Sequence, residues 1–415
     1  TYAHTFTCPR INCPELLLSV TLKGFQRRWN YTPAAKVVGK VAAATAAAAA
    51  AVATLAMWNF LVAAKVVSQL VQAQALPTLT QALVAFSSSN VSVTLFDVPG
   101  LGDLHRKFTG LPESCEVLVG VRASSVNPAD RFTPGPFPQV MGSDLAGVVL
   151  AVEDTCKRLK PGDRVWADIG AVTYSGAQKG KENGAYAQVA VALETQLGGM
   201  PSNLDFQEAA SLPKVALTSY KALAWYGGAP YAGLNKTVLI LGGSGGCGIT
   251  AIQLAKAFSA TQIITTTSAA NKDFVQQLGA DKVVDYHAVN WWDVLADGSV
   301  DVIYDTVGQA GTGDRAMKKL RSGGYYVAIA GAHPSQPRSD VHVKWFINSD
   351  TNLNNFHILD TLRNLVEEDK LRMQRLKSFK LSDVLTAFSE SAEGHVNGKL
   401  VIDVPSLPIS HDEFF

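Results

Sequence analysis

A strand that runs into a glycine-rich loop is the feature that most constrains the fold of this chain. The strand residues 237–241, apolar except for Thr237, precede Gly243-x-Gly245-x-x-Gly248, and a new apolar segment follows. The first glycine of such a loop permits a tight turn, the second lets the backbone approach a pyrophosphate, and the third lets helix and strand pack closely. The helix N-terminus adds amide donors for the phosphates. The alternative is a glycine-rich turn without a ligand.

The predicted dinucleotide-contacting residues of this loop are Gly243, Ser244, Gly245, Gly246, Cys247 and Gly248. Strand and helix patterns alternate around them, which predicts a parallel, doubly wound α/β sheet. The predicted strands are residues 237–241, 262–267, 282–285, 300–304 and 325–330, with a helix over 272–278. Earlier in the chain, short strands over 91–96 and 117–121 indicate a β-rich domain.

The position that selects between the two nicotinamide dinucleotides carries no acid. An NAD site usually has Asp or Glu about twenty residues after the loop, where it binds a ribose hydroxyl. Here that position is Ser268, and Lys272 follows at the start of the next helix. A hydroxyl and a cation suit a 2′-phosphate, whereas an acid would repel it. We therefore predict NADPH as the cofactor, with a solvated Lys272 as the alternative.

Short motifs along residues 91–405 carry a family resemblance. They are Ser125-Val-Asn-Pro-Ala-Asp130, Gly142-Ser-Asp-Leu-Ala-Gly147, Pro161-Gly-Asp-Arg-Val165, Gly184-Ala-Tyr-Ala187, Ser211-Leu-Pro213 with Thr218, the glycine loop, Leu278-Gly-Ala-Asp281 with Asp285-Tyr286, Asp305-Thr-Val-Gly308 and Gly398-Lys-Leu-Val401. In this order they resemble the medium-chain dehydrogenase/reductase superfamily, in its zinc-free quinone oxidoreductase branch. They are similar to plastid alkenal/enone reductases and mitochondrial NADPH-quinone reductases.

The resemblance implies a domain organisation. A GroES-like, β-rich substrate domain is expected over residues 91–225 and 364–405, with a Rossmann cofactor domain inserted over 226–363. Residues 1–90 would be an N-terminal extension and 406–415 a tail. The active site is expected in the cleft between the two domains.

The resemblance also implies site residues. Asn127 would lie beside the nicotinamide and orient the ring or the substrate carbonyl, unless it is only a turn asparagine before a proline. The positions that match cofactor-contacting residues are Thr218, Tyr286, Gly308 and Lys399. Tyr286 as a core residue and Lys399 as a surface strand residue are the alternatives. Two residues depart from the family pattern, because Arg131 replaces a common aromatic residue and Lys214 replaces a usually apolar one.

The sequence predicts no metal. The positions that would carry catalytic zinc ligands are Asn127 and Gly142-Ser-Asp, and no closely spaced cysteine cluster is present. Hydride transfer to a quinone or to an electron-poor C=C needs no Lewis acid, because the substrate delocalises the incoming charge. The five cysteines are odd in number and scattered, which argues against a disulfide framework and favours a reducing compartment.

The N-terminal extension contains a candidate membrane helix. A helix is predicted over about residues 34–76, and its residues 41–64 carry no charge, which is long enough to span a bilayer. Alanine contributes little to insertion, so a helix packed on a partner protein and an uncleaved signal-like segment remain alternatives. The chain begins at Thr1 rather than Met, which suggests processing after import into a plastid or mitochondrion.

Two functions from different classes fit these observations. Charged residues make up 17% of the chain and the net charge is +1, so nothing indicates a nucleic-acid partner. The first function is a metal-independent NADPH-dependent reductase of a quinone or of the C=C of an enone or enal, tethered to an organelle membrane. The second is a non-catalytic accessory subunit of an organellar membrane complex that keeps the reductase fold.

Overall fold

The computed structural model describes residues 78–407 with short gaps. The gaps are residue 88 and residues 104–112, 132–136, 171, 176–177, 182–183, 332 and 349–352, and the side chains of 172–175 and 178–181 are not described either. The chain divides into two compact units, Thr1–Ala75 and Leu76–Phe415. The predicted helix over 34–76, with its candidate span 41–64, lies outside the described residues. No helix of the described part is long and apolar enough to cross a membrane.

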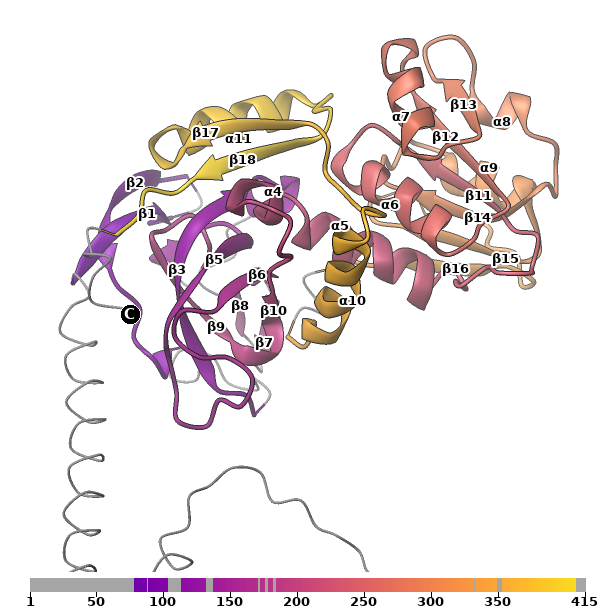
Figure 1. The fold of residues 1–415 in the computed structure, drawn as a ribbon. Coiled ribbons are helices and arrows are strands. Elements are labelled where there is room, and N and C mark those ends of the chain that lie inside the picture. The colour runs from indigo at the N-terminus through magenta and orange to yellow at the C-terminus, as the bar shows by residue number, and fades with distance from the viewer. Residues whose placement is uncertain are drawn as a thin grey trace, which may run out of the picture. The chain divides into compact units, whose positions relative to one another are not determined.

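A six-stranded parallel sheet forms the predicted doubly wound domain (Figure 1). Its strands in spatial order are β13 (Lys282–Asp285), β12 (Gln262–Thr267), β11 (Thr237–Leu241), β14 (Val300–Asp305), β15 (Leu320–Ala328) and β16 (His342–Trp345). Its helices are α6 (Gly246–Ala257), η4 (Ala269–Asn271), α7 (Lys272–Leu278), α8 (Trp291–Val294) and α9 (Thr312–Lys319). Along β11, Val238 and Ile240 join one core cluster while Leu239 joins another. The strand is therefore buried on both faces, which explains its continuous apolar sequence.

A seven-stranded sheet forms the GroES-like part. Its order is β10 (Gly198–Gly199), β6 (Arg164–Asp168), β5 (Asp144–Val152), β3 (Glu116–Ser125), β18 (Lys399–Asp403) and β17 (Leu376–Lys380), with β9 (Val189–Leu193) also paired to β3. Two smaller sheets consist of β2 (Val91–Asp97), β1 (Leu79–Ala85) and β4 (Gln139–Val140), and of β7 (Val172–Ser175) and β8 (Gln178–Lys181). The short helices here are η1 (Pro128–Arg131), η2 (Glu194–Gln196) and α4 (Phe206–Ala210).

Strand β1 lies within residues 1–90, which the sequence assigned to the extension. Its residues Leu83 and Val84 are fully buried, and the strand pairs with both β2 and β4. The β-rich domain therefore begins at or before Leu79. The strand escaped prediction because its buried stretch lacks the strict alternation by which a half-buried strand is recognised.

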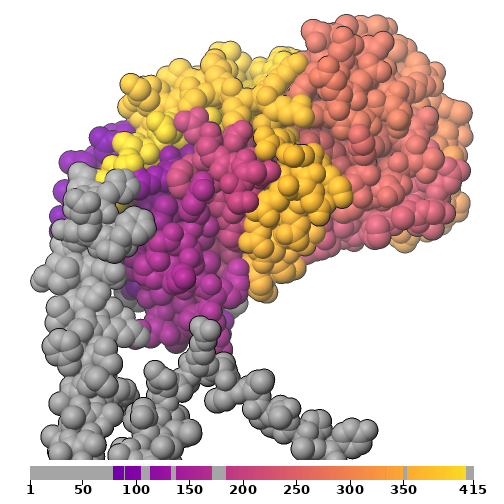
Figure 2. All heavy atoms as spheres, in the orientation of Figure 1, coloured from indigo at the N-terminus to yellow at the C-terminus, as the bar shows by residue number. Residues whose placement is uncertain are grey.

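The C-terminal segment returns to the β-rich domain. After α10 (Phe356–Glu367), strand β17 pairs in parallel with β18, and β18 pairs antiparallel with β3, as Val401 with Ser125. In the sequence, η6 (Leu381–Asp383) and α11 (Val384–Glu393) connect β17 to β18. Figure 2 shows this segment, in yellow, packed against the indigo and magenta strands. This return brings Lys399 next to the end of β3.

Helix α5 (Pro213–Tyr220) connects the β-rich domain to the Rossmann sheet. It continues into a π-helical turn, η3 (Lys221–Trp225). The hydroxyl of Ser219 on α5 donates to the carbonyl oxygen of Cys247 on α6 at 2.9 Å. The end of α5 is thus fixed against the residue that follows the glycines at the start of α6.

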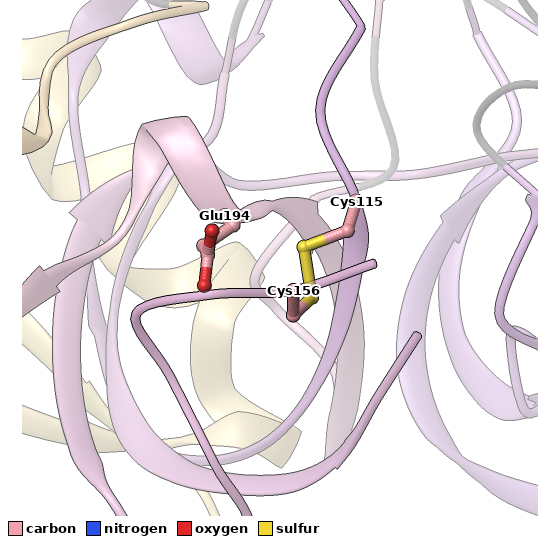
Figure 3. A group of neighbouring side chains, drawn as sticks. All are labelled: Cys115, Cys156 and Glu194. Carbon is pink, nitrogen blue, oxygen red and sulfur yellow. A yellow bond between two sulfur atoms is a disulfide. The ribbon is translucent and has the colours of Figure 1, made fainter. Parts of the chain in front are cut away.

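A disulfide joins Cys115 and Cys156 (Figure 3), contrary to the expectation from cysteine count. Cys115 lies just before β3 and Cys156 just after β5, at the same end of an antiparallel pair in which Val117 faces Val152. The Cα atoms are 5.3 Å apart, within the range of a disulfide. The 41-residue separation hid this pairing, because only the strand register brings the two residues together.

Glu194 completes a group of three residues whose possible ligand atoms all lie within 4.8 Å of one another, among the residues described. Its carboxylate accepts the backbone N–H groups of Arg158 at 2.6 Å and Leu159 at 2.9 Å. The two sulfur atoms of the group are bonded to each other. These contacts explain the group as a structural support for the turn after β5.

Candidate active site

The glycine loop connects β11 to α6. The N–H of Gly243 donates to the carbonyl oxygen of Thr266 on β12 at 2.9 Å. A Cβ atom on Gly243 would overlap the Thr265 side chain, and one on Gly248 would overlap the Gly242 carbonyl. A Cβ on Gly245 would meet nothing nearer than 3.5 Å. The outer two glycines are therefore required for packing, whereas the middle one leaves an open backbone face that fits a pyrophosphate.

Ser244 and Cys247 fill the non-glycine positions of the loop. The Ser244 hydroxyl accepts from Thr267 at 2.9 Å, and its carbonyl oxygen accepts the N–H of Gly398 at 3.1 Å. Burial raises the pKa of the Cys247 thiol to about 11, so the thiol stays protonated at neutral pH. Cys247 is thus a packing residue rather than a nucleophile.

Polar and cationic side chains gather where β12 ends. The partly buried Ser268 accepts from Asn271 Nδ2 at 3.1 Å, and Lys272 is exposed at the start of α7. Arg375 Nη1 donates to Asn271 Oδ1 at 2.7 Å, and its guanidinium lies 3.8 Å from the centroid of the Phe274 ring. The sequence did not indicate Arg375, because it is 104 positions from Asn271.

The ends of β13 and β14 lie at the same edge of the sheet. Tyr286 follows β13 and is 46% exposed, so its interpretation as a core residue is wrong. Gly308 follows β14 with φ +72°, and its N–H donates to Asp305 Oδ1 at 2.9 Å. In parallel sheets, ligands bind at the carboxyl ends of the strands.

Asn127 lies at the end of β3 and is 3% exposed. Its Oδ1 accepts from Lys399 Nζ at 2.6 Å, and its Nδ2 donates to Asp144 Oδ2 at 2.7 Å. Lys399 is 4% exposed and also donates to the Val126 carbonyl oxygen at 2.8 Å. Its interpretation as a surface strand residue is therefore wrong. Asn127 is also the turn asparagine before Pro128, since its carbonyl oxygen accepts the N–H of Asp130 at 3.0 Å.

A second layer of hydrogen bonds surrounds Asn127. Ser143 Oγ donates to Asp130 Oδ1 at 2.5 Å, and the Tyr186 hydroxyl donates to Asp130 Oδ2 at 2.9 Å. Burial raises the pKa of Tyr186 well above its usual range, so its hydroxyl remains a neutral donor. Burial also raises the pKa of Asp144, while the Lys399 ammonium acts in the opposite direction.

The two residues that depart from the family pattern have different environments. Lys214 is 8% exposed, and its Nζ contacts both carboxylate oxygens of Asp168 at 2.9 Å. Asn348 Nδ2 donates to Asp168 Oδ2 at 2.9 Å. Thr218, one turn along α5, donates to the Lys214 carbonyl oxygen at 2.6 Å. Arg131, in contrast, is exposed. No sequence motif indicated that Asp168 and Asn348 belong to the site.

Comparisons with known proteins agree with this architecture. Residues 113–204 match the alcohol dehydrogenase GroES-like domain, and residues 278–402 match the zinc-binding dehydrogenase family. A 2-methylene-furan-3-one reductase of Solanum lycopersicum is 34% identical over 298 residues, which are 69% of this chain and 71% of that protein. The mitochondrial NAD(P)H oxidoreductase RTN4IP1 of Bos taurus is 31% identical over 340 residues, covering 70% and 82%.

A solved structure shows the same fold. The quinone oxidoreductase from Coxiella burnetii superposes with a TM-score of 0.63 at 26% identity, covering 79% of this chain and 100% of that one. A Rossmann domain combined with a GroES-like domain defines a nicotinamide-type dehydrogenase/reductase fold. The chain belongs to the medium-chain dehydrogenase/reductase superfamily, as its motifs indicated. Its relatives also include a chloroplastic quinone-oxidoreductase homolog of Spinacia oleracea, 29% identical over 311 residues, which are 70% of this chain and 91% of that protein.

Proposed function

We propose that this chain is an NADPH-dependent reductase of a quinone or of the C=C of an enone or enal, and that it needs no metal. The glycine loop and the names of relatives support the proposal. The open backbone at Gly245 lies at the ligand-binding edge of a parallel sheet, and relatives carry names such as NADPH-dependent alkenal/one oxidoreductase, chloroplastic, of Arabidopsis thaliana. When bound, the reduced nicotinamide supplies the hydride.

Different residues of the chain bind different parts of the cofactor. Gly243–Gly248 bind the pyrophosphate through backbone amides, and Ser268 and Lys272 bind the 2′-phosphate. Arg375, held beside Asn271 at 2.7 Å, adds positive charge near that position. The remaining cofactor-contacting residues in this proposal are Thr218, Tyr286, Gly308 and Lys399.

The buried Asn127–Lys399 contact is the observation that carries the proposal furthest. Lys399 and Asp144 hold opposite ends of the Asn127 amide, at 2.6 and 2.7 Å. This fixes the orientation of a polar group beside the glycine loop, because Gly398 is hydrogen-bonded to Ser244 of that loop. An amide held in one orientation can align the nicotinamide ring, and its burial excludes water from the side of the ring that it contacts.

Consumption of NADPH tests the proposal. Purified protein is incubated with NADPH and, in turn, with trans-2-hexenal, 3-buten-2-one or p-benzoquinone. A separate reaction with 1-butanol and NADP⁺ is the alcohol control. We expect oxidation of NADPH with an enal, an enone or the quinone, slower oxidation of NADH, and no reaction with the alcohol. Tight NADPH binding without turnover of any carbonyl substrate would contradict a reductase.

The accessory-subunit function remains the second candidate. The uncharged residues 41–64 support it, because hydride transfer itself requires no such segment. In the proposed reductase the same segment tethers the enzyme to an organelle membrane. Native purification separates the two: a reductase is active when isolated alone, whereas an accessory subunit is recovered only within a larger membrane assembly.

A further inference from the structure

A buried ion pair at the start of α5 lies beside the proposed site. The Lys214 ammonium contacts both oxygens of Asp168 at 2.9 Å, and Asn348 donates to one of them. The Lys214 side chain is 11% exposed and that of Asp168 is fully buried. Desolvation of two charges offsets most of their attraction, so a buried pair is weak evidence for a stabilising role. The position of the ion pair beside the proposed site indicates its role better than its contribution to stability does.

Asp144 connects Lys214 directly to Asn127. The backbone N–H of Lys214 donates to Asp144 Oδ1 at 2.7 Å, and Asn127 Nδ2 donates to Asp144 Oδ2 at 2.7 Å. The next residue, Val215, reaches the glycine loop, since its Cγ1 lies 3.0 Å from where a Cβ on Gly246 would be. Residues 214 and 215 therefore contact both the carboxylate that holds the Asn127 amide and the glycine loop.

Hydrogen-bond capacity distinguishes Lys214 from Asn127. Asn127 already gives its oxygen to Lys399 and its NH₂ group to Asp144. An ammonium has three N–H groups, and within the described part of the chain its acceptor is Asp168 alone. One N–H of Lys214 is thus available for a ligand.

The charge of Lys214 persists at neutral pH. Burial acts to lower the pKa of its ammonium, but the negative charges of Asp168, Asp130 and Asp144 outweigh burial, so the pKa lies above its ordinary value. A permanently protonated amine is a strong hydrogen-bond donor and a poor acid. Lys214 is therefore suited to stabilise an anion rather than to give up a proton.

We propose that Lys214, held in place by Asp168 and Asn348, donates a hydrogen bond to the substrate oxygen that gains negative charge during reduction. This rests on the proposed reductase function. In an enone, the hydride lost by the nicotinamide forms a C–H bond at the β-carbon, and the C=C electron pair shifts so that the carbonyl oxygen becomes an enolate. Water then protonates the α-carbon. The substrate gains the two electrons that the nicotinamide loses.

The first test separates turnover from cofactor binding. Lys214→Met removes the charge and Lys214→Arg keeps it. Lys319→Met serves as the control, since Lys319, at the end of α9, forms a 2.6 Å ion pair with Asp297, whose side chain is 71% exposed. With trans-2-hexenal we expect kcat to fall about 10- to 100-fold in K214M, to be largely retained in K214R, and to be unchanged in K319M. The Kd for NADPH, from nucleotide fluorescence, should change less than about twofold in all three.

The second test does not depend on turnover. The p-nitrophenolate anion resembles an enolate, and its absorption reports the ionisation of p-nitrophenol bound to the NADP⁺-loaded protein. We expect wild type to lower the pKa of bound p-nitrophenol by at least about one unit, as an adjacent cation does, and K214M not to. If K214M fails to fold, Lys214→Gln is measured instead.

The outcomes separate the two proposals. An unchanged kcat in K214M, or wild type that shows no preference for the phenolate, overturns the role of Lys214 while leaving the reductase intact. Wild type that oxidises no NADPH with any enal, enone or quinone overturns the reductase, and the role of Lys214 with it. Equal losses of NADPH affinity and kcat in K214M and K214R would indicate a structural role and also overturn it.

Discussion

At the scale of single residues, three buried lysines lie in or near the proposed site. Lys214, Lys221 and Lys399 are each less than 9% exposed. Lys399 contacts Asn127 and the Val126 carbonyl, and Lys214 contacts Asp168. Burial on this scale disfavours a charged amine unless acidic groups compensate. Lys214 and Lys221 therefore differ in pKa, because three carboxylates act on Lys214 whereas burial dominates at Lys221.

Lys221 provides a test through the pH dependence of stability. Burial lowers its pKa from 10.5 to about 7; the charge of Asp168 opposes this shift and that of Lys214 adds to it. Between pH 7 and 10.5 the unfolded chain binds a proton at this residue that the folded chain does not. The free energy of unfolding should therefore rise with pH, by about 1.4 kcal/mol per unit from this group.

Lys221→Met removes that contribution. Urea unfolding of wild type and K221M between pH 7.5 and about 9.5 should give a shallower pH dependence for the variant. Subtraction cancels the other titrating groups, because both proteins share them. Parallel curves for the two proteins would show that Lys221 is charged in the folded state.

Lys272 should select between the two nicotinamide dinucleotides. It is exposed at the N-terminus of α7, close to Ser268. Lys272→Ala should weaken NADPH binding by about 1–3 kcal/mol, as expected for the loss of a charge-assisted contact to a phosphate. NADH binding should change little. Equal losses for both cofactors in fluorescence titrations would remove Lys272 from the 2′-phosphate site.

The metal content follows from the residues around Asn127. Asn127 Nδ2 and Ser143 Oγ, which occupy the expected ligand positions, lie 3.3 Å apart as hydrogen-bond partners. Neither residue type is among the usual zinc ligands. We expect elemental analysis of the purified protein to find no stoichiometric zinc, and chelators to leave folding and turnover unchanged. One zinc per chain would refute this.

At the scale of elements, the sequence predicted the bounds of helices and strands where local patterns mark both ends. The strand before the glycine loop and the helix Lys272–Leu278 have the predicted bounds, because apolar runs, glycines and a loop motif mark both ends. Contacts across long sequence separations were not predictable. The Cys115–Cys156 disulfide, the Lys214–Asp168 pair and the Arg375–Asn271 contact all depend on strand register or on the return of the C-terminal segment.

The glycine loop allows packing and binding to be separated by two substitutions. Gly248→Ala places a Cβ against the Gly242 carbonyl oxygen, so we expect it to lower the free energy of unfolding by about 1–3 kcal/mol. Gly245→Ala meets no close neighbour and should change stability by less than about 0.5 kcal/mol while weakening NADPH binding. Chemical denaturation and nucleotide fluorescence measure the two effects. The same phenotype in both variants would contradict these separate roles.

At the scale of the whole molecule, the last strands close the structure around the site. Strand β18 completes the β-rich sheet on β3, while Gly398 just before it hydrogen-bonds Ser244 of the glycine loop. One short segment thus contacts the sheet that carries Asn127 and the loop that is proposed to hold the pyrophosphate. A disturbance at Gly398 or Lys399 should therefore reach both sides of the site, which a residue within a single domain would not do.

The orientation at a membrane is the property on which the two proposed functions differ most. Five basic residues lie within the twenty positions before segment 41–64, namely Lys23, Arg27, Arg28, Lys36 and Lys40, whereas Lys65 alone follows closely. The positive-inside rule would then keep the N-terminus in the matrix or stroma and place the folded domain across the membrane. A reductase instead needs its domain on the side that holds NADPH, or a helix that does not cross.

We expect the folded domain on the NADPH side, because the rule describes retention of loops during insertion and imported organelle proteins need not follow it. Protease added to intact organelles, to organelles with a ruptured outer membrane and to detergent lysates measures the orientation. Digestion of the domain only in detergent is the expected result. A variant without residues 41–64 is the control and should be released by a carbonate wash. Digestion as soon as the outer membrane is ruptured would separate the domain from its cofactor supply and favour the accessory subunit.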